Sequence, residues 1–127
     1  MEFLDTKTLT LVVAAVRKSF TYSLEYNVIK CQSKTDEVGP KGGKRLKCNI
    51  CQESFGERDI KVDHIEPIVP LHKSQREMTL QEFYERCFCK LDNLQVLCKE
   101  CHDKKSKQES KQRSDFRKAK KKFVKGK

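Results

Sequence analysis

The sequence predicts a small α+β protein of one domain, held together in part by a bound metal ion. Two Cys-x-x-Cys pairs, at residues 48–51 and 98–101, supply four thiols in closely spaced couples. Two short β-branched segments, 61–65 and 93–97, lie between these pairs, and helical patterns precede and follow them. A chain of 127 residues suits a single domain.

The composition predicts a thin hydrophobic core. Hydrophobic residues make up 36% of the chain, charged residues another 36%, and there is no Trp. A structural metal would compensate, because the free energy of metal binding is coupled to folding.

Cysteine usage indicates an intracellular protein. The seven cysteines are an odd number, and the apolar run 9–16 follows Glu2 and Asp5 rather than a positively charged segment, unlike a secretory signal. This run is also too short to span a bilayer, so no membrane association is expected. Intracellular thiols stay reduced, so paired cysteines are interpreted as metal ligands rather than disulfides.

The net charge is concentrated at the C-terminus. Residues 1–103 contain 16 Lys+Arg and 16 Asp+Glu, whereas residues 104–127 contain 12 Lys+Arg and two acids, which accounts for the whole net charge of +10. Such an arm favours a polyanionic partner, and nucleic acid is the commonest. The alternative is a solvated tail that adds only solubility.

The N-terminal part predicts two helices. Residues 5–20 place apolar side chains at three- and four-residue spacing, with Asp5 or Thr6 as the cap, which is typical of an amphipathic helix. Residues 21–31 fit either a helix or a strand, and we favour a short helix that begins near Ser23.

The middle of the chain predicts a loop, a tight turn and a strand. The run 32–47 is polar and rich in Gly, so we expect a loop there. The first cysteine pair, 48–51, forms the turn. Residues 61–65 form the first strand of a hairpin, which Pro67 and Pro70 end.

The last part predicts helix, strand and helix. Thr79, with a Glu three residues later, is a capping-box signature for a helix that runs through about Cys87. Residues 93–97 form the second strand of the hairpin. A final helix begins near Cys98 or Lys99 and continues into the basic arm.

The paired cysteines predict a structural zinc site. Zn²⁺ binds four thiolates tetrahedrally at about 2.3 Å, and each Cys-x-x-Cys turn presents two sulfurs on one side of the ion. The intervening chain must fold back to unite the two pairs, as a strand–loop–strand hairpin does. The predicted ligands are Cys48, Cys51, Cys98 and Cys101. The alternative role, that of small buried apolar residues, is the one expected for Cys31, Cys87 and Cys89.

Further residues stand in a fixed order around these pairs. Asp63 and His64 are adjacent in the first strand, Asn93 opens the second, and His102 follows the last cysteine. This arrangement over residues 45–106 resembles the zinc-containing HNH endonucleases with a ββα-metal fold. The stretch around the second cysteine pair is similar to small HNH nucleases encoded by bacteriophages.

The resemblance implies a role for each of these residues. In the HNH family the His of the Asp-His pair is the general base, here His64, and an imidazole pKa of about 6.5 suits proton abstraction at neutral pH. Asp63 and His102 are implied ligands of a catalytic divalent ion. A regular strand would place Asp63 and His64 on opposite faces, so the backbone is expected to turn both inward. Asn93 is implied to tether the loop and orient the base.

A catalytic site with one carboxylate, one imidazole and open positions suits Mg²⁺, Mn²⁺ or Ni²⁺. Some HNH enzymes have an additional His near position 105, which this chain lacks, so the lysines there are expected to reach phosphates instead. The expected DNA contacts are Lys104, Lys105, Lys107, Lys111 and Arg113.

We therefore expect a divalent-metal-dependent DNA endonuclease that nicks or cuts both strands. It comprises an N-terminal helical segment and loop (1–44), a nuclease core (45–106) and a basic arm (107–127). The alternatives are a non-catalytic zinc-stabilised nucleic-acid-binding module, or an accessory subunit working with other phage DNA-processing or packaging proteins. A binding module has no need for the adjacent Asp and His, which favours the enzyme. A phage-encoded protein would act in the cytoplasm of its bacterial host.

Overall fold

Two capped helices begin the part of the chain that this computed structural model describes, residues 5–125. Helix α1 (Thr6–Phe20) starts where Asp5 accepts a 2.8 Å hydrogen bond from the backbone N–H of Thr8. Helix α2 (Leu24–Gln32) starts in the same way at Ser23. Both predicted helices are confirmed, because each is opened by a side chain that satisfies otherwise free N–H groups.

The predicted loop over 32–47 is wrong. This stretch forms β1 (Lys34–Val38) and β2 (Lys44–Lys47), which pair antiparallel, and β3 (Ser54–Phe55) extends the sheet on the other side of β2. The glycines make the turn between β1 and β2 rather than an irregular loop, with Gly42 at a φ of 85°.

A second antiparallel pair consists of β4 (Ile60–His64) and β5 (Leu94–Cys98). The bounds of both strands agree with those predicted for the hairpin to within one residue. In the register, Asp63 lies opposite Gln95 and His64 lies opposite Leu94. Every residue of β5 is buried, which matches its apolar sequence.

The predicted helices of the second half are also present. Helix α3 (Leu80–Cys87) is capped by Thr79, whose side chain accepts a hydrogen bond from the N–H of Glu82. Helix α4 (Lys99–Lys125) follows β5 directly and includes almost all of the predicted arm, of which residues 126–127 lie outside the described part. Single 3₁₀ turns cover Glu57–Asp59, Gln75–Glu77 and Leu91–Asn93. The fold class is thus α+β over the described residues, as predicted.

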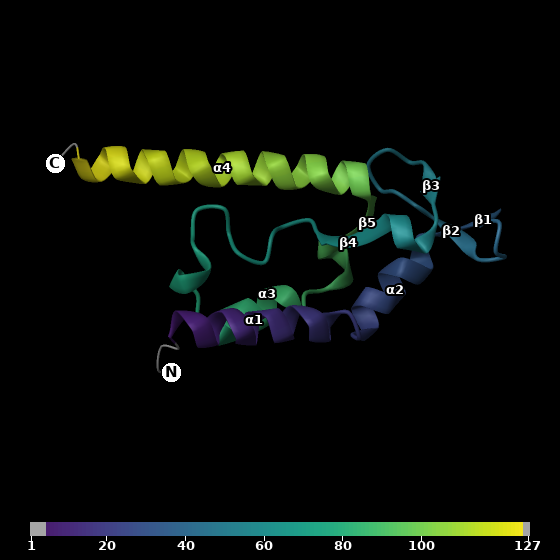
Figure 1. The fold of residues 1–127 in the computed structure, drawn as a ribbon, viewed down its shortest axis with the longest axis horizontal. Helices are drawn as coiled ribbons and strands as arrows, with labels where there is room; N and C mark the ends of the chain where they lie inside the picture. Colours follow the sequence, from purple (N-terminus) through teal and green to yellow (C-terminus); the bar gives the residue numbers. More distant parts are fainter. Residues whose placement is uncertain (1–4, 126–127) are drawn as a thin grey trace.

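The main core lies between α1, α3 and the loop that follows β4. Its buried members are Val13, Phe20, Ile68, Val69, Met78, Phe83, Cys87 and Leu94. Helix α4 runs along the other side of this loop, away from α1 and α3 (Figure 1). Cys87 is the buried apolar residue that we predicted, but Cys31 is exposed, because it lies on a helix with no buried residue. No helix in the described range is long and apolar enough to cross a membrane.

Candidate functional site

The four predicted zinc ligands come together. Cys48 and Cys51 lie in the turn after β2, Cys98 ends β5, and Cys101 lies in the first turn of α4. Their sulfur atoms all lie within 4.8 Å of one another, and the Cys51 and Cys98 sulfurs are 4.0 Å apart. A tetrahedral ion with bonds of about 2.3 Å separates its sulfurs by about 3.8 Å. The cluster could therefore hold a metal ion such as zinc.

Local backbone geometry forms each half of this cluster. Gln52 adopts a φ of 65° and donates its N–H to the carbonyl of Cys48 at 3.0 Å, which closes the first turn tightly. In the second half, the N–H of Cys101 points at the sulfur of Cys98, 3.4 Å away. Both turns thus direct cysteine side chains towards the centre of the cluster and place backbone N–H groups near their sulfur atoms.

The surroundings of two of these thiols, Cys48 and Cys101, shift their pKa values in opposite directions. Burial opposes ionisation of Cys48, but backbone hydrogen bonds from Cys98, Cys51 and Ile50 outweigh it and lower the pKa of Cys48 to about 6. In contrast, the hydrogen bond to the Cys98 sulfur, together with burial, raises the pKa of Cys101 to about 12. A bound divalent ion would compensate the charge of all four thiolates.

The two implied ligands of the catalytic ion also face each other. Asp63 is 11% exposed, and its Oδ1 atom lies 3.9 Å from Nε2 of His102. Two ligand atoms that share one ion at about 2.1 Å are separated by about 3.0 Å at a right angle and by about 4.2 Å when opposite. The observed separation lies between these two values, so a small movement of either side chain would let Asp63 and His102 share one divalent ion.

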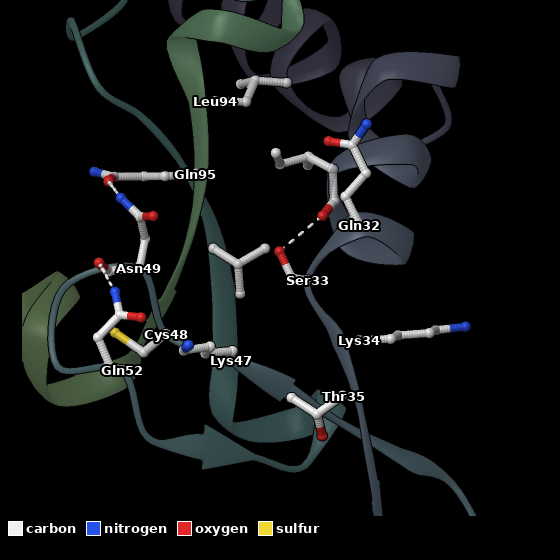
Figure 2. Close-up of a pocket in the computed structure, with 12 residues that line it drawn as sticks. Gln32, Ser33, Lys34, Thr35, Lys47, Cys48, Asn49, Gln52, Leu94 and Gln95 are labelled. Atoms are coloured by element: carbon white, nitrogen blue, oxygen red, sulfur yellow. Dashed lines mark hydrogen bonds between the residues drawn. The ribbon is translucent and has the colours of Figure 1, made fainter.

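The other oxygen of Asp63 is held by the protein. Its Oδ2 atom accepts a hydrogen bond from Nε2 of Gln95 at 2.9 Å and lies 3.1 Å from Nζ of Lys105. Gln95 in turn accepts a hydrogen bond from Nδ2 of Asn49 at 2.9 Å, and Asn49 lies between the two cysteines of the first pair (Figure 2). Asp63 is therefore connected to the cysteine cluster through two side-chain amides.

His64 is held in a defined protonation form. Its Nε2 atom lies 2.7 Å from the carbonyl oxygen of Cys87, and its ring packs 4.9 Å from the ring of Phe20. A carbonyl can only accept, so Nε2 carries the proton and Nδ1 keeps a free lone pair. Burial lowers the pKa of His64, although the Cys87 carbonyl and the charge of Asp63 oppose this. The imidazole is thus neutral at neutral pH and can accept a proton.

The expected backbone distortion at Asp63 and His64 is absent. Pairing stays regular up to His64, so Asp63 reaches towards α4 while His64 reaches towards α1 and α3. Both still border one polar pocket of about 260 Å³, because the pocket lies at the end of the strand. His102 and Arg17 line the same pocket.

Asn93 fastens the chain that follows His64. Its Oδ1 atom accepts a hydrogen bond from the N–H of Glu66 at 2.8 Å, and its Nδ2 donates to the carbonyl of the same residue at 3.2 Å. The backbone of Asn93 also accepts from Ile65 at 2.8 Å. These hydrogen bonds attach the loop after β4 to Asn93, and the role implied for this residue in orienting a base stays a prediction.

Two of the five cations expected to contact DNA are half-buried and make contacts within the protein. Lys105 is 18% exposed, and its Nζ lies 3.1 Å from Glu109 and from the carbonyl of His64 as well as from Asp63. Arg113 donates to the carbonyls of Val69 and Pro70. Both lie on the face of α4 that packs on the molecule, and their contact with DNA stays a prediction. Lys104, Lys107 and Lys111 are exposed.

Sequence reasoning missed two residues of this site, Gln95 and Glu109. Each acts on a predicted residue through a contact that depends on three-dimensional placement, across the β4–β5 pair for Gln95 and along α4 for Glu109. One feature of the sequence could have indicated Gln95. It is an amide inside an otherwise apolar strand, and a buried amide needs a hydrogen-bond partner.

No protein-family model matches the chain, and neither the curated proteins nor the solved structures contain a significant match to it.

Proposed function

We propose that the protein is a divalent-metal-dependent endonuclease that hydrolyses phosphodiester bonds in DNA. The observation that carries this proposal is that Asp63, His64 and His102 border a single polar pocket, with one oxygen of the Asp left free towards His102. A carboxylate and an imidazole that can share an ion, beside a second imidazole that can take a proton, are the groups that metal-assisted hydrolysis requires.

The reaction assigns one task to each side chain. Asp63 and His102 would hold Mg²⁺, Mn²⁺ or Ni²⁺, which when bound would neutralise charge on the phosphate. Nδ1 of His64 takes the proton of the attacking water, whose oxygen forms the new bond to phosphorus while the bond to the leaving 3′-oxygen breaks.

Arg17 offers a positive charge that would bind a phosphate in this pocket. Its guanidinium stacks 5.2 Å from the ring centre of Phe83 and lines the pocket together with His64. Stacking fixes the direction of the cation without neutralising it, and the described residues offer Arg17 no ion pair.

We also propose that the ion in the cysteine cluster is Zn²⁺ and that its role is structural. Four thiolates leave no open coordination position, which is typical of structural sites, and the cluster joins β2, β5 and α4.

One observation favours a second candidate, a non-catalytic zinc-stabilised module that binds nucleic acid. The ammonium group of Lys105 already pairs with Asp63, so this carboxylate has a cationic partner without any divalent ion. In such a module, Asp63 and Lys105 would serve to anchor α4 on β4.

A plasmid assay separates the two candidates. Supercoiled DNA is incubated with the purified protein and Mg²⁺, Mn²⁺ or Ni²⁺, and nicked and linear products are measured. We expect cleavage that falls by roughly 10²–10⁴-fold in His64→Ala, because the proton acceptor is lost. The matched control is His72→Ala, which removes a histidine outside the pocket and should cleave like wild type. Equal cleavage by wild type and His64→Ala contradicts the assignment of the base. Intact DNA binding without cleavage under every metal supports the binding module.

A further inference from the structure

Helix α4 has an inner face that packs on the rest of the protein. His102 and Lys105 reach Asp63 from this face, and Arg113 donates to the carbonyl groups of Val69 and Pro70. Further along, Phe116 lies 6.4 Å from the ring of His72, and Lys120 pairs with Glu77 at 3.5 Å. Together with Glu109, which pairs with Lys105, these residues recur every three or four positions, so they share one side of the helix.

The opposite face of α4 carries a row of lysines. The row, here called the outer face, comprises Lys104, Lys107, Lys111, Lys118 and Lys122, all exposed. At about 100° per residue, these positions centre on the side of α4 directly opposite the inner face, and they extend over about 27 Å. Within residues 5–125, no other helix or strand lies beyond this side of α4 (Figure 1).

The charge of the outer face is almost uncompensated. Among these five lysines, Lys104 alone has an ion pair in the described chain, with Glu100 at 3.4 Å, and both partners are exposed to solvent. Such a pair contributes little to stability. The five cations therefore stay available to an external anion.

The composition of the outer face decides between classes of polyanion. A helix that lies on a membrane inserts apolar side chains beside its cations. Between Lys99 and Lys122, the one large apolar side chain of α4 is Phe116, which is 49% exposed and lies on the inner face beside His72. A straight row of lysines without apolar neighbours suits a linear phosphate backbone.

We propose that the outer face of α4 binds the backbone of a second DNA segment, different from the segment whose phosphate enters the pocket. The choice of DNA rests on the proposed function. The pocket opens beside His102 on the inner face, and the thickness of a helix, about 10 Å, separates it from the lysine row. The protein thus holds two segments on two sides of one helix.

A bridging assay tests this proposal. One short duplex is fixed on beads, a second labelled duplex is free, and the labelled duplex retained by full-length protein is measured against salt. The outer-face variant carries Lys104→Gln, Lys107→Gln, Lys111→Gln and Lys118→Gln. The matched control carries the same four-charge reduction on the β1–β2 hairpin, at Lys34, Lys41, Lys44 and Lys47, all exposed.

We expect wild type and the hairpin control to retain the labelled duplex. The outer-face variant should retain at least about tenfold less, and the logarithmic salt dependence of bridging should fall by roughly 3 to 4, about 0.9 per lost phosphate contact. Its cleavage of a single duplex should match that of the hairpin control. Circular dichroism and metal content should be unchanged in both variants.

Three outcomes would overturn the proposal. These are absence of bridging by wild type, equal loss in both variants, and binding of vesicles with anionic lipids by the outer face without bridging of DNA. Selective loss of bridging by a protein that cleaves under no condition leaves this inference standing and rejects the proposed nuclease. Cleavage by a wild-type protein that does not bridge two duplexes rejects this inference and leaves the proposed nuclease standing.

Discussion

The side-chain amide of Gln95 holds one oxygen of Asp63 from directly across the β4–β5 ladder, at 2.9 Å. Gln95 is 8% exposed, and its own carbonyl oxygen is bound by Asn49 inside the first cysteine pair. A buried amide with both ends occupied keeps its partners in place, because any rotation would leave a polar group unsatisfied. The orientation of Asp63 is thus linked to the closure of the cysteine cluster.

Replacing Gln95 should weaken divalent-metal binding at Asp63. Gln95→Leu keeps the approximate size of the side chain but removes the donor, and partners of this kind typically change metal affinity by about 10–100-fold. We expect a weaker affinity for Mn²⁺, measured by electron paramagnetic resonance, with the metal content of the cysteine cluster unchanged. The control is Gln108→Leu on exposed α4. The same Mn²⁺ affinity in both variants would show that Gln95 does not position Asp63.

Removing the charge of Lys105 should have the opposite effect. Its ammonium group lies 3.1 Å from Asp63 and repels any cation that approaches this carboxylate. In Lys105→Met, we expect Mn²⁺ to bind more tightly, by roughly tenfold, because a like charge in a partly buried site is lost. Lys104→Met, on the exposed side of α4, should bind Mn²⁺ like wild type. Weaker binding in Lys105→Met would instead mean that this lysine holds Asp63 in its binding position.

Loss of one cluster cysteine should unfold the protein. Cys98→Ser removes a ligand at the junction of β5 and α4, and structural zinc contributes apparent binding free energies of about 10–16 kcal/mol in small domains. We expect loss of both bound metal, by elemental analysis, and helical circular dichroism. Cys31→Ser, which changes an exposed cysteine outside the cluster, should retain both. A folded, metal-free Cys98→Ser protein would refute a structural role for the site.

The pH dependence should report His64. Its pKa is lowered from the ordinary 6.5 by burial, so cleavage should remain constant at neutral pH and fall only in acid, as Nδ1 becomes protonated. The unfolded state binds a proton on His64 more readily than the folded state does. The contribution of neutral His64 to folding stability is therefore fully present above pH 6.5 and is lost as pH falls through the folded-state pKa. Thermal unfolding of wild type and His64→Gln, compared across this range, should converge in acid. An acid limb of cleavage above pH 6.5 would contradict this assignment.

Local signals explain why the sequence predicted the helices well. Asp5, Ser23 and Thr79 each cap a helix through a hydrogen bond to a residue three positions later, so their effect is visible in a short window. The β1–β2 hairpin lacks such a signal. Leu46 is its single buried residue, and strands with polar residues on both faces show no alternation.

The candidate site also divides into features that local sequence reveals and features that depend on tertiary packing. The cysteine pairs and the Asp-His step are contiguous in sequence and could be predicted from spacing, whereas the inward direction of Lys105 depends on how α4 docks. One lysine in a basic run cannot be distinguished from its neighbours until the packed face of the helix is known. Lys104 and Lys105 are adjacent in sequence, yet one is in solvent and the other is beside Asp63.

Helix α4 contains neither Gly nor Pro from Lys99 to Lys125, so it has no built-in hinge over a length of about 40 Å. Cys101 is anchored in its first turn, whereas Lys118 lies about 25 Å further along the axis. A sideways force applied near Lys118 acts first on the contacts of Phe116 with His72 and of Lys120 with Glu77. Because the helix has no hinge, the part of the load that these contacts do not resist reaches its first turn, where Cys101 and His102 lie.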